Sequence, residues 1–253
     1  MKISKKIISL IGVITFSFSS VAADLSCGDH FVGKAPPNVS AVVNHERNLC
    51  FAEFAIGYSM LSRSPLYSAE HLTALEVRQA KLIDRNDQFH EESSLPDNAR
   101  AELRDYRGSG FDRGHLAPSA DMPTESSQFE SFSLANMVPQ LHANNAGIWS
   151  RIESSVRAVA VRYGDVYLVT GGIYESSHQK INGRIQVPNA MFKSLYVPSL
   201  GAAAVFVVDN DTSGIYRIIS VDELNLLTGI DVYPSLPQEI KSTVTVFPVF
   251  GNK

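Results

Sequence analysis

The chain carries FDRGHLAP at residues 111–118 and NNAGIWSRIESSVR at residues 144–157, and these two stretches decide its fold. The second stretch has helical periodicity. At about 100° per residue, five apolar side chains fall on one side of a helix: Ile148, Trp149, Ile152, Val156 and Val159. The pattern predicts a long amphipathic helix from about residue 145 to residue 162, with Trp149 in the core.

Two polar residues on this helix need an explanation. Asn145 lies on the centre line of the apolar stripe, and Glu153 lies at its edge. One explanation is capping, because an Asn at a helix start often binds free backbone N–H groups. Asn144 could supply that cap instead. The other is a hard cation, since an amide oxygen and a carboxylate, directly or through water, suit Mg²⁺.

The histidine of the first stretch also has two interpretations. His115 stands beside Asp112 and Arg113 in a glycine-containing segment. Such a histidine can be a hydrogen-bonded structural residue or a general base, because its usual pKa lies close to neutrality. Arg113 could bind a phosphate with its planar guanidinium. His142, close to the predicted helix, could be a surface residue or a substrate contact, and the surface position is expected.

Together these motifs resemble the DNA/RNA non-specific endonuclease family, which are secreted ββα-metal nucleases. The resemblance rests on DRGH at 112–115, LANMVPQ at 134–140, and the pattern N-x-G-x-W-x-x-x-E-x-x-x-R from Asn145 to Arg157. The histidine, asparagine and glutamate follow at family-like intervals of 30 residues (115 to 145) and 8 residues (145 to 153). Further similar segments are VYLVTG at 166–171, VPNAMFK at 187–193, and VDEL followed by LTG within 221–229, so the resemblance covers roughly residues 51–245.

The resemblance implies roles for three residues of a metal centre. His115 would be the general base that takes a proton from the attacking water. Asn145 would be the one direct protein ligand of Mg²⁺, with Mn²⁺ as a possible substitute. Glu153 would hold a metal-bound water.

The resemblance also implies contacts to the substrate. Arg113 and Arg157 would contact the phosphate or the transition state, and Asn136 would help to shape the substrate site. Arg85 resembles the family's upstream arginine. The implied reaction is hydrolysis of DNA and RNA phosphodiester bonds to 5′-phosphorylated products, by a metal-assisted attack of water.

The mixture of strands and helices predicts an α+β fold around a mainly antiparallel sheet. The resemblance implies a ββα-metal nuclease fold, with such a central sheet and flanking helices. Residues 68–75 are expected to start a helical turn, and the polar residues 78–107 a long surface excursion. Strands are expected at 51–61, 166–170 and 202–208, with a hairpin partner at 216–221 and a short helix opening at 221.

The N-terminus has the pattern of a secretory signal peptide. Lysines at 2, 5 and 6 precede an apolar run at 7–18 and small residues at 21–23. A membrane anchor is the alternative, but the apolar run is short for a span. The sequence therefore predicts a signal at 1–23, an exported protein, periplasmic or secreted, and one nuclease domain at 24–253. Its extension, residues 24–50, would be tethered by a Cys27–Cys50 disulfide, the alternative being two free thiols.

Composition limits the function classes. The chain has 253 residues, 44% hydrophobic and 19% charged, as in a globular protein. Without the three signal lysines, 22 − 3 leaves 19 Lys+Arg against 26 Asp+Glu, a net charge of −7. No global basic field attracts nucleic acid or a membrane, so DNA and RNA would be bound as substrates by a local patch. Two other functions stay open: a phosphodiesterase for small nucleotides, and a catalytically weak nucleic-acid-binding protein. The sequence leaves the oligomeric state open.

Overall fold

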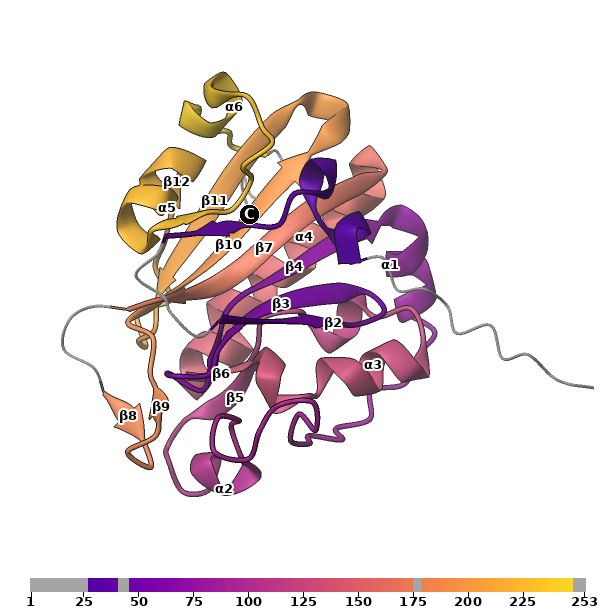
Figure 1. Cartoon of the computed structure of the whole chain (residues 1–253). Helices are drawn as coiled ribbons and strands as arrows, with labels where there is room; N and C mark the ends of the chain where they lie inside the picture. The colour runs from indigo at the N-terminus through magenta and orange to yellow at the C-terminus, as the bar shows by residue number, and fades with distance from the viewer. Residues whose placement is uncertain (1–26, 41–45, 175–178, 248–253) are drawn as a thin grey trace, which may run out of the picture.

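A computed structural model describes residues 27–40, 46–174 and 179–247. Its centre is a seven-stranded sheet in which every neighbouring pair is antiparallel (Figure 1). Its strands, in spatial order, are β12 (Tyr216–Ile219), β11 (Ala202–Asp209), β10 (Ala190–Val197), β7 (Asp165–Ile173), β4 (Ser64–Thr73), β3 (Phe54–Ser59) and β2 (Glu46–Cys50). The α+β prediction with a mainly antiparallel sheet is confirmed.

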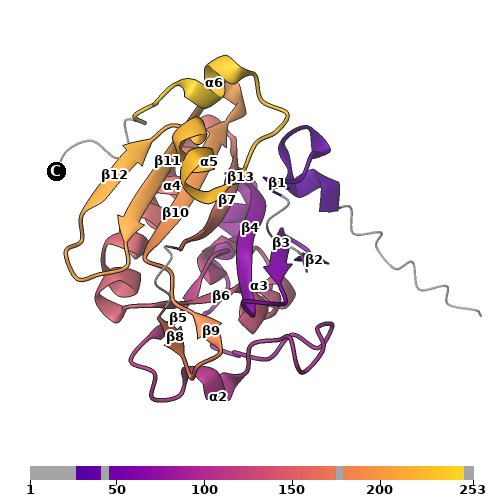
Figure 2. The same cartoon turned by 60° about the vertical axis from the view of Figure 1, so that its left-hand side comes forward.

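Helices cover both faces of this sheet, as Figure 2 shows. On one face, α4 (Ser150–Tyr163) and the turn before it bury the predicted apolar stripe, Trp149 included, against Leu168 and Phe206. On the other face, α5 (Val221–Thr228) packs near Val169 and Val205. Successive side chains of a strand point to opposite faces. The central strands are therefore buried on both sides, which fixes their register.

The segment that carries the two deciding motifs lies beside this sheet as two strands and a helix. Strand β5 (Asp112–His115) pairs antiparallel with β6 (Met137–Gln140). Their connection contains the 3-10 turns η3 (Ser119–Asp121) and η4 (Leu134–Asn136) and helix α3 (Glu125–Ser131). After β6 come a π-helical turn, η5 (Asn144–Trp149), and then α4. The expected ββα unit is present, but a kink at Gly147 (φ −98°, ψ −109°) divides the single long helix that the sequence predicts.

Most expected elements outside this unit are found at their predicted places. Strands β3, β7, β11 and β12 lie within or overlap the predicted ranges, and α5 begins with a capping box between Ser220 and Glu223. The helical turn predicted from residue 68 is wrong. Strand β4 continues to Thr73, because it pairs with β3 on one side and β7 on the other, and α1 (Ala74–Ala80) starts only after it.

Smaller elements complete the described chain. The surface excursion at 78–107 contains α2 (Leu103–Tyr106), and a hairpin of β8 (Lys180–Ile181) and β9 (Ile185–Gln186) lies near it. Strand β1 (Asn38–Val39) pairs with β13 (Ile230–Asp231). The remaining elements are η1 (Cys27–His30), η2 (Val32–Lys34), η6 (Pro198–Leu200) and α6 (Gln238–Ser242).

The predicted disulfide is confirmed. Cys27 and Cys50 are bonded, with their Cα atoms 5.7 Å apart, and this joins η1 to the edge strand β2. The predicted signal peptide at 1–23 lies outside the described residues. Within the described ranges, no helix has the length and apolar character to cross a bilayer.

Candidate active site

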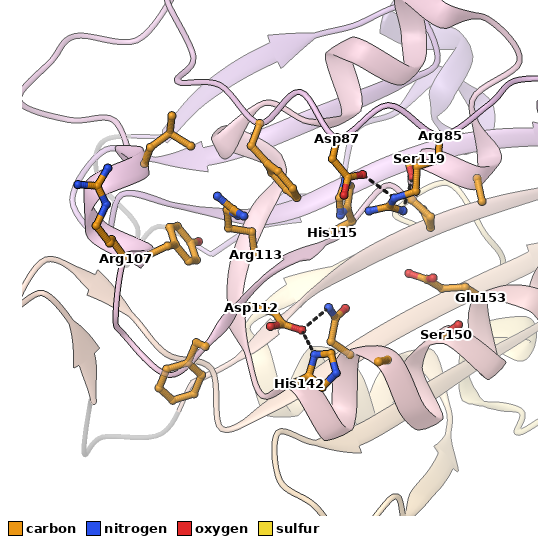
Figure 3. Close-up of a pocket in the computed structure, with 18 residues that line it drawn as sticks. Arg85, Asp87, Arg107, Asp112, Arg113, His115, Ser119, His142, Ser150 and Glu153 are labelled. Atoms are coloured by element: carbon orange, nitrogen blue, oxygen red, sulfur yellow. Dashed lines mark hydrogen bonds and ion pairs between the residues drawn. The ribbon is translucent and has the colours of Figure 1, made fainter.

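A cleft of about 750 Å³ opens between β5, the start of α4 and the surface excursion. Five of the seven residues that the sequence predicts for the site line it: Arg85, Arg113, His115, Asn145 and Glu153 (Figure 3). They come from separate parts of the chain. The cleft therefore exists only because the ββα unit and the loop before it fold together.

His115, the last residue of β5, is buried, with 9% of its surface exposed. Its ring packs against Phe132 (centroids 4.9 Å apart, edge-on) and Phe89 (5.7 Å). Its Nε2 atom is buried and has no hydrogen-bond partner among the described residues, which leaves Nδ1 as the ring nitrogen for the cleft. Burial, and then the positive charges of Arg85 and Arg113, lower the pKa of His115 to about 3. The imidazole is therefore neutral near pH 7 and can accept a proton.

Gly114 sets how closely β5 and β6 approach behind this histidine. A Cβ atom at Gly114 would lie 2.8 Å from Cβ of Gln140 and still closer to the side-chain oxygen of Gln140. The DRGH motif therefore needs glycine at position 114, because Gln140 leaves no space for a side chain there. A larger side chain would push β5 away from β6 and displace His115.

Asn145 is held by a carboxylate of the first motif. Its Nδ2 atom donates to Oδ2 of Asp112 at 3.0 Å, and the same oxygen is 2.8 Å from Nδ1 of His142. Because the amide nitrogen is engaged, the amide oxygen Oδ1 is the atom left to bind a cation. His142 is exposed, as expected, yet it also lies on the rim of the cleft.

The capping explanation for the two asparagines is wrong. Neither makes a side-chain cap at the start of the π-helical turn. The buried Asn144 instead donates to the main-chain oxygen of Asp209 (2.6 Å) and accepts a hydrogen bond from Gln140 (2.6 Å). It ties the ββα unit to the end of β11, a contact that the local sequence pattern does not reveal.

Glu153 projects from the first turn of α4 into the cleft. Burial raises the pKa of its carboxyl to about 7, Asp121 adds to the rise, and Lys193 and Arg157 oppose it. Without a bound cation, the carboxyl is therefore partly protonated near neutral pH. A cation nearby would favour the ionised form.

Two arginines flank His115 in the cleft. The guanidinium of Arg113 stacks over the ring of Phe89 at 4.0 Å. That of Arg85 is paired with Asp87 (2.6 Å) and donates to Ser119 (2.8 Å). Asp87 and Phe89 were not predicted, and only their place just after Arg85 in the chain could have indicated them.

The remaining two predicted residues lie outside the cleft. Asn136 has no exposed surface, and its amide bonds both the N–H and the carbonyl of Ala117 and the carbonyl of Ser131. It shapes the site by fixing the turn after His115, and in this conformation it does not reach a substrate. Arg157 is paired with the buried Asp121 (2.8 Å), so its charge is engaged inside the protein.

The oxygen donors suit a hard, largely hydrated cation. No group of three or more His, Cys, Asp or Glu side chains that could hold a metal occurs among the described residues. The cleft instead offers the amide oxygen of Asn145 and the carboxylate of Glu153. Such a sparse oxygen set matches Mg²⁺, which keeps several waters, better than Zn²⁺, which takes four protein ligands in structural sites and three in catalytic ones.

The chain matches known proteins over most of its length. The model of the DNA/RNA non-specific endonuclease family matches residues 34–239. Nuclease C1 of Cunninghamella echinulata is 33% identical over 57% of this chain and 63% of its own length. The mitochondrial nuclease EXOG of Danio rerio is 30% identical over 78% of this chain and 64% of its own length. The chain thus spans about three fifths of these relatives.

A solved structure supports the fold. The crystal structure of the EndoG/EndoGI complex, which concerns inhibition of EndoG, contains a chain that superimposes with a TM-score of 0.71 at 23% identity. The match covers 79% of this chain and 91% of that one. At this identity the likeness shows a shared fold.

Proposed function

The chain belongs to the DNA/RNA non-specific endonuclease family, and we propose that it hydrolyses phosphodiester bonds of DNA and RNA to 5′-phosphorylated products. The observation that carries the proposal is His115. It is held neutral in a cleft that also holds Asn145, Glu153 and two arginines. A binding protein has no need for a neutral buried histidine beside a set of cation ligands.

His115 is the general base. A water positioned in the cleft transfers a proton to Nδ1 as its oxygen attacks phosphorus, and the bond from phosphorus to the 3′ oxygen breaks. The 3′ oxygen takes a proton from solvent and leaves as a hydroxyl, the phosphate stays on the 5′ oxygen, and the proton on Nδ1 passes to solvent. A base works best with a pKa near the working pH. Bound phosphate offsets the charges of Arg85 and Arg113, which raises the pKa of His115 from its low value in the free protein.

Asn145 and Glu153 would hold the divalent cation, Asn145 through Oδ1 and Glu153 through water. When bound, Mg²⁺ or Mn²⁺ stabilises negative charge on the phosphoryl and leaving oxygens. Asp112 holds the amide of Asn145 in place by accepting from its nitrogen. Such a partner of a metal ligand fixes the ligand's orientation.

Arg113 binds the phosphate. Its guanidinium lies over the ring of Phe89, 4.0 Å from the ring centroid, and this contact restricts where its N–H groups can point. Contacts to phosphate carry no base information, and this accounts for cleavage without sequence preference. A site that does not depend on the 2′-hydroxyl accepts both DNA and RNA.

We also propose that the protein is exported, to the periplasm or the medium. The signal pattern at residues 1–23 and the Cys27–Cys50 disulfide support this, since disulfides persist in oxidising compartments. The names of several relatives assign those proteins to mitochondria. Cell fractionation, with mass spectrometry of the mature N-terminus, tests export directly.

Digestion of plasmid DNA and of RNA by purified protein tests the activity. Wild-type protein is assayed with Mg²⁺, Mn²⁺ or EDTA, beside His115→Ala and the control His71→Ala, whose side chain pairs with Asp165 and does not line the cleft. We expect the wild type to cleave both substrates. EDTA and the His115→Ala substitution should each abolish cleavage, and His71→Ala should retain it. Full activity of His115→Ala contradicts the assigned base. A folded, metal-loaded wild type that binds nucleic acid without cleaving it supports the binding-protein alternative, and hydrolysis of small diesters alone supports the phosphodiesterase alternative.

A further inference from the structure

The cleft extends past the metal ligands and the histidine to a wall built by α2 and the residues after it. Leu103, Tyr106 and Arg107 line the cleft on this side. In Figure 3, Arg107 lies at one end of a row that continues through Arg113 toward Arg85. At about 750 Å³, the cleft is in the size range that holds whole small molecules, so it has room for more than one phosphate group.

The three arginines of the cleft differ in their free charge. Arg85 is paired with Asp87 at 2.6 Å. Within the described part of the chain, Arg107 and Arg113 have no carboxylate partner. Arg113 lies two residues before His115 in the sequence, whereas Arg107 is exposed at the far end of the row. An unpaired guanidinium in a cleft is a site for an anion.

The wall that carries Arg107 is fixed from behind. Arg184, on the β8–β9 hairpin, contacts Oε2 of Glu102 (2.6 Å) and Oδ1 of Asp105 (3.2 Å). Asn182 adds a hydrogen bond to Asp105 (3.1 Å). These contacts neutralise the two acidic residues of the wall. Because α2 is held before any substrate arrives, less entropy is lost when Arg107 binds an anion.

We propose that Arg107 forms a second phosphate subsite, which holds a phosphate of the same strand that flanks the scissile one. The inference rests on the proposed nuclease function and names its preferred substrate class, polynucleotides over isolated diesters. A small diester has one phosphate and engages only the centre around Arg113 and His115. A strand engages that centre and Arg107 together, which supplies local positive charge to a chain that is acidic overall.

The test compares Arg107→Ala with Arg104→Ala. Arg104 lies on α2, three residues before Arg107, pairs with Glu102 and does not line the cleft, so it controls for the loss of one positive charge. Both variants are assayed on linear double-stranded DNA and on bis(p-nitrophenyl) phosphate, with Mg²⁺, after thermal unfolding confirms that they fold. We expect Arg107→Ala to raise KM for DNA by about tenfold, as for the loss of one charged hydrogen bond, with turnover of the small diester unchanged.

Salt dependence gives a second readout. The slope of log(kcat/KM) for DNA against log[salt] is expected to become shallower by about 0.9 in Arg107→Ala, as for one lost phosphate contact, and Arg107→Lys should restore most of it. Equal DNA kinetics of Arg107→Ala and Arg104→Ala overturn the subsite. An equal loss of Arg107→Ala activity on the small diester also overturns the subsite, because it shows a general effect on the site around Arg113 and His115. A wild-type protein that is inactive on both substrates contradicts the nuclease function itself, and this result differs from the two outcomes that overturn only the subsite.

Discussion

The Nζ atom of Lys193 lies 3.3 Å from the main-chain oxygen of Leu116 and donates a hydrogen bond to it, directly behind His115. Lys193 is fully buried, also donates to Thr170 (2.7 Å), and lies 3.9 Å from Oε1 of the buried Glu70. Lys193 on β10 and Glu70 on β4 thus lie together behind the end of β5. Neither residue was predicted for the site.

This pair gives a pH-dependent prediction. Burial raises the pKa of Glu70 well above its usual range, and Lys193 opposes the rise. In Lys193→Met that opposition is lost, so folded Glu70, which already binds its proton more tightly than unfolded Glu70, binds it more tightly still. Stability then falls as pH rises above the unfolded pKa toward the folded one. We expect the variant to lose about 3–5 kcal/mol of unfolding free energy at pH 8 and less at pH 5.

Urea unfolding at both pH values measures this loss. Lys193→Met combined with Glu70→Gln is the matched control, because it removes the buried acid, and its deficit should be small and nearly independent of pH. A deficit of Lys193→Met that stays constant from pH 5 to pH 8 would contradict the account.

Burial of His115 predicts the opposite pH dependence. Its folded pKa, about 3, is below the unfolded value of 6.5, so the unfolded state binds more protons between these values. His115 therefore costs stability as pH falls below 6.5, by up to about 1.4 kcal/mol per pH unit. His115→Gln should gain stability relative to wild type when the pH is lowered from 7.5 to 5. Urea unfolding of both proteins across this pH range measures the difference. If their unfolding free energies change in parallel with pH, the prediction is wrong.

The contact from Asn145 to Asp112 predicts a defect in metal use. Asp112→Asn removes the carboxylate that accepts from the amide of Asn145. Loss of such a supporting group typically costs about 10–100-fold in metal affinity or activity. We expect the Mg²⁺ concentration for half-maximal cleavage to rise by that order. His142→Ala removes only the outer contact to Asp112 and should change it little; an equal effect of the two variants would show that the carboxylate does not act through Asn145.

We expect the disulfide to contribute to the stability of the fold and not to catalysis. Its two cysteines are 23 residues apart in sequence, and closing such a loop is worth about 3 kcal/mol in the entropy model. Neither cysteine lines the cleft. Cys27→Ser with Cys50→Ser should therefore lower the unfolding free energy by about that amount and keep kcat on DNA at 25 °C. A loss of kcat while the protein remains folded would contradict the separation of bridge and site.

Much of the ββα unit could be predicted because its signals are local. The apolar stripe of α4 repeats with the helical period, so residues 148–159 indicated both the helix and its buried face. The histidine, asparagine and glutamate were placed together by the resemblance to the family, whose intervals they share, and the structure brings all three to the cleft. The hairpin of β11 and β12 was readable from its apolar runs and the polar turn between them.

Only the tertiary structure decided which polar groups are free for chemistry. Arg157 is paired with Asp121, 36 residues away, whereas Arg107 is left without a carboxylate partner among the described residues. Asn144 reaches Asp209, 65 residues further along the chain. Periodicity reports which face of a helix or strand is buried, but it carries no information on which distant side chain meets that face. The sequence by itself therefore determined the motif, the helix and the chemistry they indicate, and packing between distant segments decided the pKa of His115, the buried support from Lys193 and the exposed charge of Arg107.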